Sequence, residues 1–179
     1  MMPLATAIIQ EISDVCEQVS EAEVHAVLSC IQKNHRIFVH GDGRSGLVIR
    51  CFAMRLMHLG YTVYVIGETI TPAVEAVDVV IGVSGSGSSV SVQETLSRAK
   101  KKDATTIAVS AKANAFSEAA DYSLIIPGAL KGDQGEHRKS IQLLSSLFDQ
   151  SLHVIMDMLA LMLSYRDQVS NEQATLNHY

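Results

Sequence analysis

Short apolar runs rich in β-branched residues recur along the chain, each long enough for one strand of a sheet. They cover residues 36–40, 62–66, 77–83, 105–110 and 122–126. Most are continuously apolar rather than alternating, which is typical of parallel strands covered by helices on both faces. The pattern therefore predicts a five-stranded parallel sheet.

Apolar residues at helical spacing fill the segments between and around these runs. Helices are predicted at residues 45–59, 89–101, 115–120 and 145–166. Residues 4–33 have the same spacing, interrupted at Ser20, which forms a capping-box pattern with Glu23 and restarts the helix. The last helix has an apolar surface broad enough to pack on the sheet and on another subunit.

Alternating strands and helices predict an α/β fold, a three-layer αβα sandwich with flavodoxin-like topology. The length fits a single domain over residues 1–179. Within it we expect an N-terminal helical extension (1–35), an α/β core (36–166) and a C-terminal tail (167–179). Residues 128–140 are the longest polar interruption and are predicted to form a mobile loop.

Composition narrows the function classes. A formal charge of −5 argues against a nucleic-acid binder, which normally presents a basic face. The cysteines, Cys16, Cys30 and Cys51, are odd in number and lack Cys-x-x-Cys spacing, so we expect reduced thiols, no metal site and a cytoplasmic protein. No apolar run reaches the roughly 20 residues of a membrane span, so no membrane association is expected.

Two glycine–serine loops, residues 41–46 and 84–89, carry the candidate chemistry. Each follows a predicted strand and precedes a predicted helix, which places both at the sheet edge where open α/β folds bind ligands. Glycine lets the backbone approach an anion, and serine hydroxyls add donors without charge. A small phosphorylated ligand is therefore predicted. The candidate binding residues in these loops are Gly43, Arg44, Ser45, Ser84, Gly85, Ser86 and Ser89.

A dinucleotide site is an alternative, because the first loop satisfies Gly-x-Gly-x-x-Gly and Glu68 follows the second strand as a possible ribose-binding acid. Three observations count against it. The motif is short, no substrate domain follows it, and the second loop has more phosphate donors than a dinucleotide fold requires there.

Four blocks together, residues 41–46, 50–60, 67–72 and 84–87, closely resemble the 6-phospho-3-hexuloisomerases, which are sugar isomerase (SIS) domain proteins. The resemblance implies conversion of D-arabino-hex-3-ulose 6-phosphate to fructose 6-phosphate, the step after 3-hexulose-6-phosphate synthase in the ribulose monophosphate pathway of formaldehyde fixation. It also implies a homotetramer. Thr69 and Thr71, in the third block, are expected to line the sugar site. The reaction is a proton transfer through an enediolate and requires no metal or organic cofactor.

The resemblance also assigns the catalytic groups. The family places a glutamate base in a Ser-x-Phe-Glu pattern at the start of the last helix, and Asp149 occupies that position here with a side chain one methylene shorter. His178 matches a histidine of the family's C-terminal tail. The alternatives are that Asp149 only caps the helix and that His178 belongs to a frayed end. A non-catalytic sugar-phosphate sensor is the competing function, because SIS domains also serve as regulatory binding modules.

Overall fold

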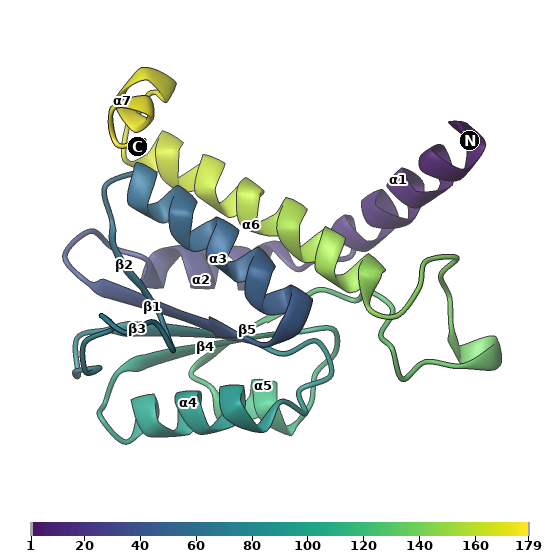
Figure 1. Ribbon diagram of the computed structural model, residues 1–179, viewed down its shortest axis with the longest axis horizontal. Helices are drawn as coiled ribbons and strands as arrows, with labels where there is room; N and C mark the ends of the chain where they lie inside the picture. Colours follow the sequence, from purple (N-terminus) through teal and green to yellow (C-terminus); the bar gives the residue numbers. More distant parts are fainter. Residues whose placement is uncertain (1, 179) are drawn as a thin grey trace.

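The computed structural model describes residues 2–178, and these contain a five-stranded, all-parallel sheet with the order β2-β1-β3-β4-β5 (Figure 1). The strands are β1 (Arg36–Gly41), β2 (Thr62–Val65), β3 (Val79–Val83), β4 (Thr105–Ser110) and β5 (Tyr122–Ile125). The direction in which successive strands are added reverses between β1 and β3, as in flavodoxin-like folds. The predicted fold class is confirmed.

Helices cover both faces of this sheet. They are α1 (Met2–Cys16), α2 (Glu21–Cys30), α3 (Gly43–His58), α4 (Val90–Lys100), α5 (Ala115–Ala119), α6 (Ser146–Arg166) and α7 (Asn171–Leu176). Figure 1 shows α2, α3 and α6 on one face and α4 and α5 on the other, while α1 projects from the body beside the start of α6. The arrangement is an αβα sandwich.

The strands contribute to a core on each face of the sheet. In β1, Ile37 and Val39 join the larger cluster beneath α3 and α6, whereas Phe38 joins the cluster beneath α4. Side chains of a strand alternate between faces, so a strand covered on both sides must be apolar at every position. This explains the continuous apolar runs of the sequence.

Among the helices of residues 2–178, α6 alone is long and apolar enough to cross a membrane by length and composition. Its position explains its composition. It packs against α3 and α1, and residues such as Phe148, Leu152 and Leu159 are fully buried in the larger core. The helix is apolar because it fills the centre of one layer.

Some local expectations need correction. Ser20 caps α2 by accepting from the Glu23 N–H, but the Glu23 side chain does not return the bond; it accepts from the Ile125 N–H at 2.8 Å and so covers the edge strand β5. The predicted tail contains a helix, α7, capped reciprocally by Ser170 and Gln173. Met1 and Tyr179, the outermost residues of the predicted domain, lie outside the described residues.

Candidate functional site

A cavity of about 670 Å³ lies at the carboxyl ends of β1 and β3, at the point where the strand order reverses. Open α/β sheets bind ligands at this point. Most of the candidate residues line it: Gly43, Arg44, Ser45, Ser84, Gly85, Ser86, Ser89 and Asp149. The sequence-derived loops therefore do meet in one place.

The N-termini of α3, α4 and α6 all face this cavity, because residues at or near the start of each helix line it. A helix N-terminus carries partial positive charge and unpaired N–H groups, so converging N-termini favour an anion. The start of α3 lies hard against β1. A Cβ atom on Gly46 would come 2.3 Å from the Gly41 carbonyl oxygen, so only glycine allows this approach.

The loop between β3 and α4 is organised by its own hydroxyls. The Ser84 Oγ accepts from the Ser89 N–H at 3.3 Å, and the Ser86 and Ser88 hydroxyls bond each other at 2.6 Å. Ser89 is the N-cap of α4 and accepts from the Val92 N–H. The loop thus presents its donors in a fixed arrangement.

Asp42 links the two glycine–serine loops, a role that the sequence did not indicate. Its carboxylate accepts from the hydroxyl of Ser89 and, at 2.5 Å, from that of Ser91. Those two hydrogen bonds hold the pKa of Asp42 below its ordinary value. The Ser89 hydroxyl is therefore engaged in positioning the loops as well as facing the cavity.

Asp149 lies in the first turn of α6 and is 4% exposed. Its Oδ1 accepts from the Ser45 hydroxyl at 2.6 Å. Burial raises the pKa of Asp149 above the ordinary aspartate value, although the Ser45 bond and the Arg44 charge oppose this. Arg44 is fixed in turn, since its Nη1 donates to the Ser146 Oγ at 2.9 Å. A buried carboxylate of raised pKa beside an anion site can accept and return a proton.

Close packing sets the position of this carboxylate. A Cβ atom on Gly128 would lie 2.5 Å from the Cα of Phe148, so the chain passes directly against the start of α6. The Phe148 ring is fully buried. Asp149 is therefore held by its neighbour on a rigid element.

The cavity lining also contains charged residues that the sequence analysis did not assign to the site. Lys112 follows the end of β4, a position from which it could have been found, whereas Lys131 and Asp133 come from the polar segment after β5 and carried no signal. Within residues 2–178, no three His, Cys, Asp or Glu side chains gather closely enough to hold a metal ion, and the cysteines are unpaired thiols.

Thr69 and Thr71 are not brought to this cavity, contrary to the expectation. They follow β2, which lies outside β1 at the edge of the sheet, one strand away from the reversal point. Thr71 donates to the Val65 carbonyl at 2.6 Å, and Thr69 is exposed. The segment is also tied to α3 through an ion pair between Glu68 and Arg50.

His178 lies at the opposite end of α3 from Asp149. Its ring stacks on that of His58, with centroids 5.1 Å apart, and Asn177 donates to the His58 carbonyl at 2.9 Å. Thirteen residue steps along α3 lead from Ser45 to His58, a rise of about 20 Å. Within one chain, the structure does not bring the two predicted catalytic residues together.

Comparison with known proteins agrees with this geometry. Residues 30–153 match the SIS domain. The chain is 38% identical to a 3-hexulose-6-phosphate isomerase of Mycobacterium gastri, over 94% of this chain and 84% of the relative. It is 33% identical to a 3-hexulose-6-phosphate isomerase of Bacillus subtilis, over 96% of this chain and 93% of the relative.

A solved structure is similar over its whole length. The crystal structure of a Methanococcus jannaschii protein, from which a 3-hexulose-6-phosphate isomerase function was inferred, superposes with a TM-score of 0.84 at 27% identity, covering 99% of this chain and 98% of that one. The resemblance found in the sequence blocks is confirmed.

Proposed function

Because this chain belongs to the SIS-domain family and is a phosphosugar isomerase, we propose that it converts D-arabino-hex-3-ulose 6-phosphate to fructose 6-phosphate. The observation that carries the proposal is Asp149, a buried carboxylate of raised pKa at a cavity built for an anion. The similarity to isomerases of this specificity supports the choice of substrate.

Asp149 is the proton-transfer base in this proposal. The carbonyl moves from C3 to C2, so a base removes the C2 proton, an enediolate forms, and a proton returns to C3. The hydroxyl proton on O2 leaves as O2 becomes the carbonyl oxygen, and O3 gains one. The Ser45 hydroxyl orients the carboxylate, and Arg44 supplies positive charge beside the developing enediolate.

In this proposal the phosphate binds against the loop of residues 84–89 and the start of α4. Ser84 and Ser86 supply hydroxyls there, and the backbone of Gly85 leaves room for close approach. The helix N-terminus adds favourable partial charge. Lys112 and Lys131 balance the carboxylates of the lining.

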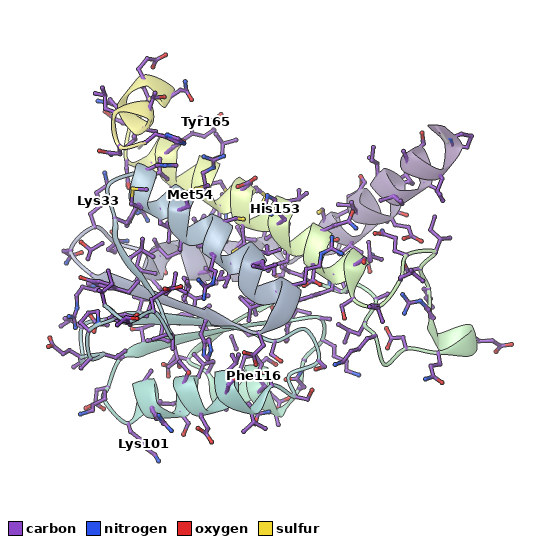
Figure 2. All side chains as sticks on the ribbon, in the orientation of Figure 1. Lys33, Met54, Lys101, Phe116, His153 and Tyr165 are labelled. Carbon is purple, nitrogen blue, oxygen red and sulfur yellow. The ribbon has the colours of Figure 1, made fainter. Side chains whose placement is uncertain are left out.

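We propose that the protein assembles as a homotetramer. Its support is an exposed apolar surface on the outer side of α3 and α6, where Figure 2 shows Met54 and Tyr165. The exposed apolar side chains of these helices are Leu47, Met54, Met57, Val154, Leu161 and Tyr165. Closed symmetric assembly is the usual way to cover such a surface. Light scattering should give about four times the 19.4 kDa chain mass; the chain mass itself would contradict the proposal.

The decisive experiment supplies D-arabino-hex-3-ulose 6-phosphate and follows fructose 6-phosphate through a coupled assay. Turnover is expected, which would place the protein after 3-hexulose-6-phosphate synthase in the ribulose monophosphate pathway. Tight binding of the sugar phosphate without turnover would instead favour the sensor function. The buried Asp149 argues against a sensor, because binding a phosphate does not require a carboxylate of raised pKa.

A further inference from the structure

The segment between β5 and α6 forms one wall of the cavity with both of its arms. Leu130, Lys131 and Asp133 line the cavity on the outgoing arm, and Leu144 and Ser145 line it on the returning arm. The returning arm leads directly into α6, whose first turn carries Asp149. A residue that holds this segment therefore fixes the position of the cavity wall and that of Asp149.

Arg138 joins the two arms. Its guanidinium donates to the Leu130 carbonyl at 3.1 Å on the outgoing arm. It also donates to the carbonyls of Gln142 and, at 3.0 Å, Leu144 on the returning arm. These bonds use the planar fork of the guanidinium, which a lysine ammonium does not reproduce. These hydrogen bonds cross-brace the segment, which the sequence predicts to be a mobile loop.

Leu144 is the point at which this brace meets α6. Its φ is 54°, in the left-handed region that a side chain with a Cβ rarely adopts. Ser145, the next residue, precedes α6 directly, and its carbonyl accepts from the Asp149 N–H at 2.9 Å. The hydrogen bond from Arg138 to the Leu144 carbonyl holds this strained residue in place.

Glu11 anchors the outer end of the same segment. Its carboxylate accepts from the Ser140 hydroxyl at 2.8 Å, the Ile141 N–H at 2.8 Å and the Gln142 amide at 3.0 Å. Gln142 in turn accepts from Gln150 on α6 at 2.6 Å. The projecting helix α1 thus contacts the segment as well as α6 (Figure 1).

We propose that Arg138 is a positioning residue that holds the segment 127–145, and through Leu144 the first turn of α6, in the geometry that Asp149 requires. Glu11 fixes the outer end of the segment. The proposal rests on the isomerase function proposed above. A displacement of the base by about 1 Å can cost on the order of a hundredfold in rate, so small movements of this brace matter.

The test compares Arg138→Met with Arg98→Met, which removes an exposed arginine of α4 that pairs with Glu94. In Arg138→Met, kcat should fall by about 10–100-fold, by more than KM rises. Amide exchange over residues 143–150 should accelerate at least about tenfold while the melting temperature changes little. Arg98→Met should match the wild type in each measurement. Arg138→Lys should be intermediate, and it decides the question if the methionine variant does not fold.

A second change separates positioning from general stabilisation. Adding Leu144→Gly to Arg138→Met should restore part of kcat, by at least about threefold, because glycine adopts the left-handed conformation without strain. The proposal would be overturned if Arg138→Met left kcat and the amide exchange of residues 143–150 unchanged. It would also be overturned if adding Leu144→Gly did not restore any of the lost kcat. A wild-type protein that does not turn over the sugar phosphate would overturn the proposed function instead, and the exchange comparison would then decide this inference alone.

Discussion

The two ends of α3 differ sharply although each borders a cavity. At the N-terminal end, Arg44 and Ser45 face the 670 Å³ cavity beside Asp149. At the C-terminal end, Arg55 and His58 border a larger cavity of about 810 Å³, which is also lined by residues of α6, α7 and the segment between them. Both ends contain titratable groups and a site large enough for a small ligand.

Helix polarity distinguishes the two ends more clearly than volume does. The N-terminal end of α3 is joined by the N-termini of α4 and α6, so its field favours a phosphate. The C-terminal end favours cations and holds the stacked rings of His58 and His178. Burial, together with the charges of His178 and Arg55, lowers the pKa of His58. The smaller cavity is therefore the one suited to a sugar phosphate.

The largest effect should come from Asp149→Asn, which keeps the shape of the side chain and removes the base. We expect kcat to fall by about 10²–10⁴-fold in the coupled assay. Asp149→Glu should retain activity, since it restores the residue type of the similar family. The matched control is Asp157→Asn, the same change on the same helix at the other cavity, which should leave kcat within about twofold. Equal losses in both asparagine variants would remove the distinction between the two ends.

The phosphate loop should give the next largest effect. Ser84→Ala and Ser86→Ala should each raise KM for the phosphorylated substrate, by about 10–100-fold, since a hydrogen bond to a charged group contributes about 1.5–3 kcal/mol. Ser164→Ala, in the lining of the other cavity, is the control and should leave KM unchanged. A KM unaffected by both loop variants would exclude these hydroxyls from phosphate binding.

Asp149→Asn should raise the stability of the folded protein although it lowers the activity. The pKa of Asp149 is raised by folding, so the folded state binds this proton more tightly than the unfolded chain. The charged carboxylate therefore costs stability above the raised pKa, and this cost disappears as pH falls below the ordinary aspartate value. Asp149→Asn should melt higher than the wild type at neutral pH, by about 2–4 °C for each 1 kcal/mol, and the difference should vanish near pH 3. A lower melting temperature at neutral pH would contradict the raised pKa.

The same pKa predicts a pH profile for the reaction. The base acts when it is deprotonated, so kcat/KM should decline as pH falls through the raised pKa, above the ordinary value for aspartate. The pH profile of kcat/KM for Asp149→Glu is compared with that of the wild type. If kcat/KM instead declined at a pH equal to or below the ordinary aspartate pKa, the carboxylate that acts as the base would be exposed to water.

The smallest effect is expected from His178→Asn. In the structure this ring stacks on His58 at the far end of α3, so kcat should change by less than about threefold. The asparagine side chain retains hydrogen-bonding capacity, which limits any effect on the tail. A loss above tenfold would show that His178 reaches a reacting group in the assembled protein and that the two ends of α3 cooperate.

The sheet was largely predictable because its strands are covered on both faces. Continuous apolar runs leave few alternatives, and the predicted span 105–110 matches β4 at both ends. The meeting of residues 41–46 with 84–89 was predictable for a related reason. Parallel strands that neighbour each other end at the same edge, so loops that follow them are brought together.

Long-range polar contacts were not predictable in this way. Arg138 binds backbone carbonyls, which every residue provides. The residue types of its partners therefore give no sign of these contacts in the sequence. Glu23 resembled a local capping residue, yet its partner Ile125 is 102 positions away. The positions of Thr69 and His178 depend on the edge placement of β2 and the packing of α7, neither of which has a local signal.

The place of α6 in the chain has a consequence for synthesis. This helix fills the centre of the larger core, but it comes after all five strands and α3 in the chain. While the ribosome adds about 5–20 residues per second, the strands and α3 emerge without the helix that covers them. Apolar residues such as Ile37 and Leu56, both fully buried in the folded protein, stay uncovered until α6 has left the ribosome. The nascent chain is therefore most exposed to aggregation after β5 has emerged and before α6 has, when chaperones that bind apolar segments would have most effect.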